Sequence, residues 1–252
     1  MAAYKSSSIK SKWVKTKWLL QHYELRQYVP RTLLFTKTNL DTMIDSYKTV
    51  FLKPTGGSGG SNIIRIKRKT KGFQTQLNRK KNFYSTQKKL LTRLSNHAGK
   101  RSYLLQKGIS LAKTKGRPFD IRVMVQKTNQ GSWITTGLFT KIGRPGKVAT
   151  NYNQGGTIGY FKSTMRGAGY SKADIQERET HLKQMGVTVG NTFDYHKRGF
   201  RELGLDVAID SKGNPWILEV NTRPQFYPLK NMSNRKLYQR MVNTGKQYGR
   251  KK

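Results

Sequence analysis

The sequence predicts an α+β fold in which strands pair through hairpins and alternate with amphipathic helices. Two apolar runs, Leu203–Ile209 and Trp216–Val220, flank the segment Asp210–Asn214. The Asp, Gly and Asn of that segment are typical of a hairpin turn. A second pair of strands, Thr49–Lys53 and Asn62–Lys67, flanks a glycine-rich loop. Apolar residues at helical spacing separate these hairpins.

Length and charge limit the classes of protein to which the chain can belong. Its 252 residues suffice for one large domain or two lobes, and its formal net charge is +38. Such a charge attracts polyanions, including nucleotides, nucleic acid and acidic polymers. The absence of Cys excludes disulfides, thiolate metal sites and a Cys nucleophile. There is no apolar run of membrane-spanning length and no signal-peptide core, so we expect a cytoplasmic protein without a membrane span.

The N-terminal quarter predicts helices around one short strand. Residues 1–11 are polar and basic, and we expect them to be flexible. Ser11–Tyr28 carries apolar residues at helical spacing, and Pro30 ends that stretch. A short strand is expected at Leu33–Phe35, followed by a helix capped by Asn39 that runs to Tyr47.

The glycine-rich loop Pro54–Ser61 is a candidate phosphate site. Its four Gly and two Ser allow the backbone to approach a ligand and to present N–H groups to phosphate oxygens. It is not a Walker loop, because no Gly-Lys-Ser/Thr follows and the exit is a strand. Lys53, which ends the preceding strand, is placed to face a phosphate. A flexible hairpin tip or linker is the alternative interpretation.

The next stretch is basic and mixes strands with one helix. Lys67–Asn82 suggests a strand around Phe73–Leu77 followed by a solvated loop. Ser85 suits the N-cap of a helix that ends near His97. Tyr103–Gln106 is a short apolar strand, after which a basic linker ends at Pro118.

The middle of the chain predicts three further strands. Phe119–Gln126 alternates, so that Asp120, Arg122 and Met124 share one face. Trp133–Lys141 is a second strand, and Lys147–Thr150 is a candidate third, followed by the polar glycine turn Asn151–Gly156.

Helices dominate the remaining predictions outside the last hairpin. Residues 157–170 give no assignment, except that Arg166–Gly169 suggests a mobile loop. Ser171 and Asp174 resemble a capping box that opens a helix through Met185. A second helix is expected at Phe193–Glu202 and a basic C-terminal helix at Asn231–Tyr248, with a charged tail after it.

Three oxygen donors converge in the last hairpin. Pairing of its strands places Asp206 and Glu219 side by side, and Asn221 shares a face with Glu219 because side chains two apart point the same way. Carboxylate and amide oxygens suit Mg²⁺, which usually completes its shell with water and substrate phosphates. An ordinary hairpin with surface carboxylates is the alternative.

The sequence gives little support for other kinds of functional site. The four His residues share no metal-ligand spacing, and there is no Gly-x-Ser-x-Gly elbow of a serine hydrolase. Aromatic and basic residues of Lys67–Tyr103 are compatible with nucleic-acid binding, but no nucleic-acid fold signature accompanies them. Non-specific binding of nucleic acid therefore stays open.

Five motifs in order resemble the ATP-grasp superfamily, and in particular its YheC/YheD spore-coat-associated group. The order and spacing are also similar to the ribosomal-protein glutamate ligases. The resemblance runs from about Lys12 to Arg223. Its motifs are the strand and glycine loop at Lys53–Ser61, Leu105–Ile109, Phe119–Val123, the turn Asn151–Gly156, and the Asp206–Asn221 hairpin.

The resemblance implies two α+β lobes whose antiparallel sheets sandwich ATP. It places a first lobe at residues 12–107 and a second at 108–248, between a flexible basic start at 1–11 and a basic tail at 249–252. The implied activity is an ATP- and Mg²⁺-dependent carboxylate–amine ligase with an acyl-phosphate intermediate, acting on an acidic peptide, protein or polymer. ADP and phosphate would be the other products.

The resemblance also implies a role for individual residues. The implied ATP contacts are Lys53, Gly56, Gly57, Ser58, Gly59 and Gly60 at the phosphates, Gln106, Lys107 and Ile109 at the adenine hinge, Asp120 near the ribose, and Lys141 and Asn151 near the γ-phosphate. Lys141, Arg122 and Arg223 are the implied catalytic residues, and Asp206, Glu219 and Asn221 the implied Mg²⁺ ligands. Either Lys12 or Lys15 matches a further nucleotide lysine.

Two departures from the resemblance bear on the substrate. We expect no separate domain ahead of the two lobes, so that a partner would supply part of the acceptor site. Lys107 stands where the glutamate ligases have an acid, which removes a side-chain contact to ribose but spares backbone contacts to adenine. Two alternatives to a ligase remain: a structural spore-coat protein that turns over little ATP, and a basic protein that binds polyanions.

Overall fold

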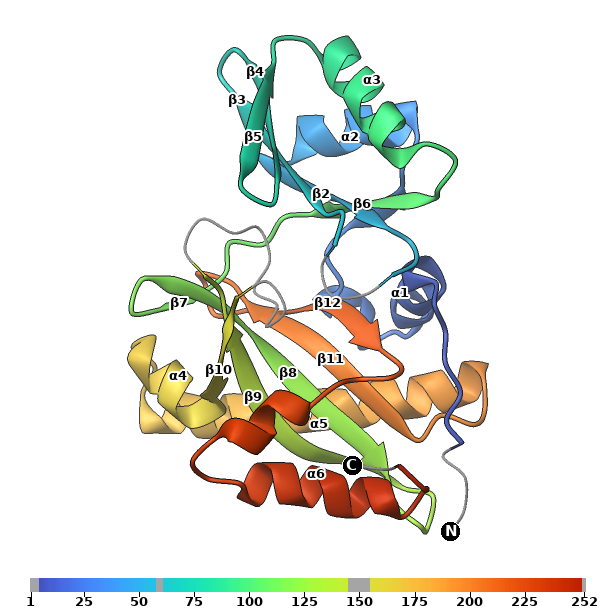
Figure 1. The fold of residues 1–252 in the computed structure, drawn as a ribbon, viewed down its shortest axis with the longest axis vertical. Coiled ribbons are helices and arrows are strands. Elements are labelled where there is room, and N and C mark those ends of the chain that lie inside the picture. Colours follow the sequence, from blue (N-terminus) through green and yellow to red (C-terminus); the bar gives the residue numbers. More distant parts are fainter. Residues whose placement is uncertain (1–4, 58–60, 145–154, 251–252) are drawn as a thin grey trace.

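Two lobes, each built on one antiparallel sheet, make up the fold (Figure 1). The computed structural model describes residues 5–57, 61–144 and 155–250. Strand order is β1-β6-β2-β3-β4-β5 in the first sheet and β10-β9-β8-β11-β12 in the second, where β7 also pairs with β8. Every described strand pairing is antiparallel. The expected α+β fold with two lobes is confirmed.

Two helices cover one face of the first sheet. Val50 and Leu52 of the strand next to the glycine loop alternate inward and pack under these helices, against Leu40 and Leu90. The opposite face of the sheet is left for the second lobe and for solvent. The elements of this lobe are β1 (Thr32–Leu34), α2 (Lys37–Ser46), β2 (Thr49–Pro54), β3 (Ile64–Lys69), β4 (Gly72–Leu77), β5 (Lys80–Tyr84), α3 (Gln87–Ala98) and β6 (Tyr103–Lys107).

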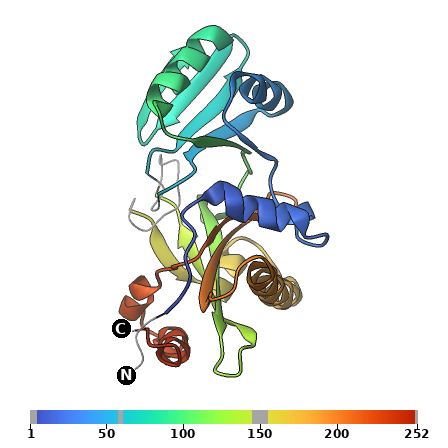
Figure 2. The ribbon, with the colours of Figure 1, turned by 90° about the vertical axis from the view of Figure 1, so that its right-hand side faces the viewer.

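The second sheet has helices on both faces. The long helix α5 lies on one face, and α6 with the short helix η3 lies on the other (Figure 2). The elements of this lobe are β7 (Lys113–Thr114), β8 (Arg117–Lys127), β9 (Trp133–Ile142), β10 (Thr157–Tyr160), α4 (Phe161–Gly167), α5 (Lys172–His196), β11 (Glu202–Ile209), β12 (Pro215–Asn221), η3 (Tyr227–Asn231) and α6 (Lys236–Lys246).

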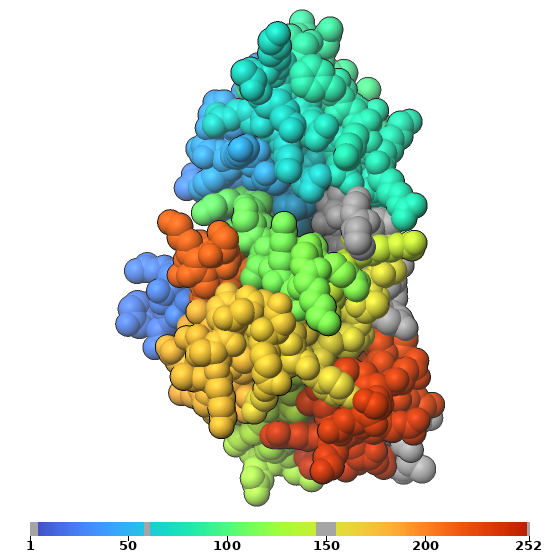
Figure 3. Space-filling model, turned by 90° about the vertical axis from the view of Figure 1, so that its left-hand side faces the viewer, coloured from blue at the N-terminus to red at the C-terminus, as the bar shows by residue number. Residues whose placement is uncertain are grey.

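The junction of the lobes is narrow and is crossed by the chain just after β6. In the space-filling view the green segment leading to β7 lies where the first lobe rests on the second (Figure 3). None of the helices within the described ranges is long and apolar enough to cross a bilayer.

The first helix belongs to the second lobe. Helix α1 (Lys12–Gln21) and the short helix η1 (Arg26–Tyr28) contribute Leu19, Leu25 and Val29 to the hydrophobic cluster of the second sheet. Figure 2 shows α1 beside that sheet, where the lobes meet. The packing therefore differs from a first lobe that starts at residue 12. Apolar periodicity identifies a helix but does not reveal which sheet it covers.

Both ends of the described chain are held against the second lobe. The Ser7 N–H donates to Gly199 O at 2.7 Å, and the Ile9 N–H donates to Thr222 Oγ1 at 3.0 Å. Arg250 forms an ion pair with Glu202. The expectation of a flexible segment is therefore wrong for residues 6–9, and Arg250 is not part of a free tail.

Several element boundaries differ from the predictions. Thr36 and Thr86, not Asn39 and Ser85, cap α2 and α3, because each threonine hydroxyl accepts a hydrogen bond from the backbone N–H three residues later. The expected solvated loop before residue 82 contains β5, which pairs with β4. The candidate strand Lys147–Thr150 lies outside the described residues.

The helical predictions were right in type but not always in length. The capping box of Ser171 and Asp174 is confirmed at the start of α5. This helix continues without a break to His196, so the two expected helices are one, and residues 198–201 are not helical. The stretch 157–170, which had no assignment, forms β10 and α4.

Candidate functional site

The β11–β12 hairpin places the three predicted oxygen donors together. Asp206 lies directly opposite Glu219, and Gly204 lies opposite Asn221. The Asn221 amide Nδ2 donates to Asp206 Oδ2 at 3.3 Å. The turn is stabilised by Asp210, whose carboxylate accepts backbone N–H donors within the loop. A shift of the register between Val207 and Asp206 then brings Glu219, rather than Leu218, opposite Asp206.

Two cations of the central strands hold Asp206. Arg122 lies opposite it on β8, and Arg122 Nε contacts Asp206 Oδ1 at 2.7 Å. Lys141 Nζ, from β9, lies 3.0 Å from the same oxygen and 2.9 Å from Asp120 Oδ1. All four side chains are buried or nearly so. The second sheet therefore carries a rigid group of alternating charges beneath the first lobe.

The charges in this group stabilise one another. Burial alone would raise the pKa of Asp206, but Arg122 and Lys141 outweigh it and hold that pKa far below the usual range. Burial alone would lower the pKa of Lys141, but Asp120 and Asp206 outweigh it and raise that pKa. Asp206 and Lys141 therefore both stay charged at neutral pH.

Helix α1 adds a lysine that links the hairpin to the glycine loop. Ser11 caps this helix by accepting from the Val14 N–H. Lys12, in its first turn, places Nζ 2.9 Å from Glu219 Oε1 and donates to Gly57 O at 2.7 Å. A single buried cation thus bridges the second lobe and the loop of the first lobe.

Lys53 reaches the same region from β2. Its Nζ donates to Gln106 Oε1 at 2.5 Å, and Gln106 Nε2 in turn donates to Thr32 Oγ1 at 3.2 Å. Lys12, Lys15, Lys53, Gln106 and Glu219 line one cavity between the lobes.

Burial lowers the pKa of Lys15 and of Lys53 from 10.5 to about 8. Within the described part of the chain, neither lysine forms an ion pair. Buried charges without a close counter-ion are costly, so these lysines would be stabilised by a bound anion.

The cavity and the group beneath it have an excess of positive charge. The cationic members are Lys12, Lys15, Lys53, Arg122 and Lys141, against the carboxylates Asp120, Asp206 and Glu219. This arrangement suits a polyanion such as a triphosphate, which would approach the lysines while its cation met the carboxylates.

The donor set also fits a hard divalent cation. Glu219 uses Oε1 for Lys12, and in the described ranges no hydrogen bond or ion pair engages its Oε2. Asp206 Oδ1 contacts both Arg122 and Lys141, while Asp206 Oδ2 accepts a hydrogen bond from Asn221. Oxygen donors from carboxylates and an amide, beside space for phosphates, are the chemistry of Mg²⁺ sites.

Not all predicted residues join this group. Arg223 is exposed on the segment after β12. Lys107 Nζ lies over the rings of Tyr47, at 5.5 Å, and Trp216, at 4.9 Å, and so contacts both lobes. Gly56 and Gly57 are described, and Gly57 adopts φ +91°, which favours glycine. Ile109 follows β6 and is partly buried; Ser58, Gly59, Gly60 and Asn151 lie outside the described residues.

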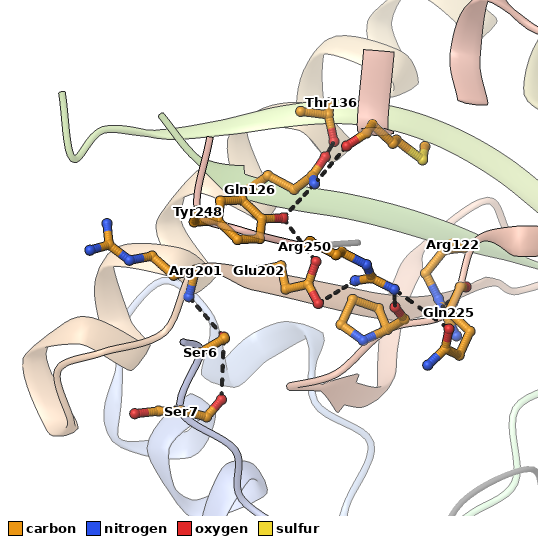
Figure 4. Close-up of polar contacts among 12 residues, drawn as sticks. Ser6, Ser7, Arg122, Gln126, Thr136, Arg201, Glu202, Gln225, Tyr248 and Arg250 are labelled. Carbon is orange, nitrogen blue, oxygen red and sulfur yellow. Dashed lines mark hydrogen bonds and ion pairs between the residues drawn. The ribbon is translucent and has the colours of Figure 1, made fainter. Parts of the chain in front are cut away.

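A second polar network was not predicted from the sequence. Glu202 is 1% exposed and accepts hydrogen bonds from Tyr248 Oη, at 2.9 Å, and from Arg250 (Figure 4). Gln126 Nε2 donates to Tyr248 Oη at 2.6 Å. Arg250 Nη2 also donates to Pro224 O at 2.9 Å. The network thus fixes the segment that follows the metal-ligand candidates.

This network reaches the candidate site through Arg122. Arg122 Nη1 donates to Gln225 O at 3.3 Å (Figure 4). The Nε atom of the same side chain contacts Asp206 Oδ1. No local sequence motif predicts these contacts, because they join residues far apart in the sequence. By contrast, Lys12 and Lys15 are three apart on one helix, so their shared face was visible in the sequence.

Comparison with known proteins gives a consistent result. The model of the YheC/D-like ATP-grasp family matches residues 3–251. Over 204 residues the chain is 29% identical to the endospore coat-associated protein YheD of Bacillus subtilis (strain 168), covering 78% of this chain and 44% of that protein. It is 25% identical over 221 residues to YheC of the same organism, covering 79% and 56%. The chain therefore spans about half the length of these relatives.

A solved structure supports the fold alone. The C-terminal domain of K. lactis Pby1, an ATP-grasp enzyme interacting with the mRNA decapping enzyme Dcp2, superposes with a TM-score of 0.52 at 16% identity. The match covers 95% of this chain and 73% of that one.

Proposed function

Because the chain belongs to the YheC/D-like ATP-grasp family, we propose that it is an ATP- and Mg²⁺-dependent carboxylate–amine ligase that acts on an acidic peptide or polymer. The ATP-grasp fold is typical of ATP-dependent ligases. The observation that carries the proposal is the meeting of Lys12, Lys53 and Glu219 between the lobes, above the ion pairs of Asp206. A purely structural protein would not require lysines buried without counter-ions beside hard metal ligands.

In this proposal the first lobe and α1 hold ATP. Lys12, Lys15 and Lys53 face the phosphates, and the backbone of Gly56 and Gly57 covers them. Both N-terminal lysines take part, since both line the cavity. In the same way, Gln106, Lys107 and Ile109 form the adenine hinge, and Asp120 lies towards the ribose.

Glu219, Asn221 and the Oδ2 atom of Asp206 would hold Mg²⁺. Bound there, the ion supplies positive charge that offsets the charge developing on the phosphates. Arg122 and Lys141 contribute by fixing Asp206, so that its Oδ2 atom, which accepts a hydrogen bond from Asn221, is already positioned before the ion binds.

The reaction transfers the γ-phosphoryl group of ATP to a substrate carboxylate oxygen, giving ADP and an acyl-phosphate. An amine nitrogen then attacks the acyl carbon, phosphate leaves, and the nitrogen loses a proton as the amide forms. Phosphoryl transfer needs in-line positioning and nearby cations more than covalent help, and the lysines provide these cations. Arg223, exposed beside the site, would orient a substrate carboxylate.

The acyl-phosphate can be trapped directly. We expect the protein with ATP, Mg²⁺, an oligoglutamate peptide and hydroxylamine to form a peptidyl hydroxamate together with one ADP per hydroxamate. Glu219→Gln should form neither product, while keeping the wild-type far-ultraviolet circular dichroism spectrum. Equal hydroxamate from wild type and Glu219→Gln would contradict the proposed site.

The relatives named as endospore coat-associated proteins lead to a proposal about location. We place this chain at the spore as well, where a ligase could modify acidic coat or cortex polymers. Association with purified spores that is kept by Glu219→Gln would separate this location from the catalytic activity.

A further inference from the structure

The outer face of the first sheet carries a row of side chains, polar except for Phe51, that starts at the candidate nucleotide site. Gln106 of β6 pairs with Phe51 of β2, and Phe51 pairs with Arg65 of β3. The row continues to Gln76 of β4 and ends at Lys81 of the edge strand β5. Directly paired residues share a face. Strands lie about 4.8 Å apart, so the row extends about 19 Å from the site to the edge.

A second row runs parallel to the first and adds charge. Lys67 of β3 pairs with Gln74 of β4, which pairs with Phe83 of β5. Phe83 is 55% exposed, Lys81 is exposed, and Arg65 and Lys67 are partly exposed. The opposite face of these strands is the one that α2 and α3 bury. These four positions are therefore accessible to a ligand, whereas Gln76, in the middle of the first row, is only 2% exposed.

No carboxylate balances the charge of this face. The sequence has no Asp or Glu between Asp45 and Asp120, although it has many Lys and Arg there. The positive charge of Arg65 is the largest cause that lowers the pKa of Lys67, and Lys69, Lys48 and Lys81 add to it. Cations that repel one another without a local counter-ion are stabilised when an anion binds.

We propose that the face formed by Arg65, Lys67 and Lys81 binds an extended acidic polypeptide and leads its carboxylates to the nucleotide site. The proposal rests on the ligase function proposed above, because that reaction needs a substrate carboxylate at the nucleotide site.

The edge strand favours a polypeptide over a nucleic acid. Among the described strands, β5 pairs only with β4, so one side of its backbone is available for a further strand. A peptide can add to such an edge by main-chain hydrogen bonds, whereas a nucleic acid cannot. The exposed ring of Phe83 would then pack against the aliphatic part of the peptide.

The test compares two variants with equal loss of charge on opposite faces of the same lobe. Lys67→Glu/Lys81→Glu alters the proposed face, and Lys88→Glu/Lys89→Glu alters exposed positions on α3. The probe is a fluorescent oligoglutamate peptide of about ten residues, measured by anisotropy at about 0.15 M salt to screen the general charge of the protein. Labelled oligothymidylate of the same length is measured in parallel.

We expect the face variant to bind the peptide about tenfold more weakly or worse, and the α3 variant to change affinity less than about twofold. Equal weakening by both variants would show that only net charge acts, and would overturn the proposal. Tighter binding of oligothymidylate, lost in the face variant alone, would also overturn it and would assign the face to nucleic acid. Lys67→Gln/Lys81→Gln serves the same comparison if the Glu variant does not fold.

Binding of Mg-ATP separates this proposal from the proposed function. The face variant should bind Mg-ATP like the wild type, because neither lysine lines the nucleotide cavity. If the wild type does not bind Mg-ATP, the ligase function fails, while the peptide comparison still decides what the face binds.

Discussion

At the scale of single residues, the buried lysines explain why an anion belongs between the lobes. Lys15 is 5% exposed, and no ion pair of its side chain is seen in the described residues. Its charge is costly in the free protein and favourable beside a phosphate. The same side chain therefore lowers stability and raises affinity, which is typical of a binding site rather than of a core.

The substitution Lys15→Met tests whether this side chain lowers the stability of the free protein and raises its affinity for the nucleotide. We expect Mg-ATP to bind about tenfold more weakly or worse, which is about 1.4 kcal/mol or more, because a phosphate-facing charge is lost. The free energy of unfolding should stay equal or rise, because the buried charge is removed. Titration calorimetry and urea denaturation measure the two quantities. Lys17→Met, on the exposed side of the same helix, should change neither.

The lowered pKa values of Lys15 and Lys53 predict a specific dependence on pH. Bound phosphate favours the charged lysines, so binding of ATP should take up protons near pH 8, and affinity should fall as pH rises above about 8. Calorimetry at pH 8 in two buffers with different heats of ionisation measures the uptake. Binding without proton uptake would contradict the assignment of these lysines.

For the ligand-free protein, we expect the opposite effect of pH: its stability should rise with pH. Between about pH 8 and the usual lysine pKa of 10.5, the unfolded chain binds more protons than the folded chain at these two positions. Their contribution to the free energy of unfolding therefore rises with pH across that window. Lys15→Met should reduce this rise.

At the scale of elements, the network around Glu202 connects α6 to the segment that leaves β12. Tyr248 and Arg250 satisfy a carboxylate that is almost fully buried, and Arg250 also holds Pro224 O. This segment carries Arg223 and contacts Arg122 through Gln225. The C-terminal helix is therefore tied to the candidate site, and it packs against Met124 on the same face of the second sheet that carries Arg122.

Arg250→Ala should be strongly destabilising. The Glu202 carboxylate would stay buried without its cation, which we expect to lower the free energy of unfolding by about 3 kcal/mol. Urea denaturation followed by circular dichroism measures the change. The exposed Arg235→Ala, at the start of α6, should cost less than about 0.5 kcal/mol. A small effect at Arg250 would contradict the network.

The elements also show what the sequence could and could not predict. The β11–β12 hairpin was predictable because Asp210–Asn214 has the chemistry of a tight turn, whereas the register shift that brings Glu219 opposite Asp206 has no local signal in the sequence. The capping box predicted the start of α5 for the same local reason. The position of α1 against the second sheet depends on tertiary packing, so its periodicity could not show that Lys12 reaches Glu219. Strand β5 was missed because its alternation is mainly of polar residues.

At the scale of the whole molecule, contact between the lobes is not confined to the candidate site. Lys107 also joins them, since its ammonium group lies over a ring of each lobe. Its position just after the first sheet suits a residue that fixes the relative orientation of the lobes.

Lys107→Met should weaken the contact between lobes. We expect the free energy of unfolding to fall by about 1 kcal/mol, the usual worth of cation–π contacts. Faster hydrogen exchange should appear in β6 and around Trp216, where the lost contacts lie. Lys113→Met, an exposed lysine a few residues later, is the matched control and should leave both unchanged. Equal exchange in the two variants would contradict a role in joining the lobes.

The net charge of +38 complicates any measurement of nucleotide binding, because it attracts every anion. The most direct test of the Mg-ATP site is therefore a titration of ATP at moderate salt, with and without Mg²⁺, for wild type and Glu219→Gln. The account predicts saturable binding that requires Mg²⁺ and is lost in the variant. Weak binding that salt removes and that Glu219→Gln leaves unchanged would contradict it.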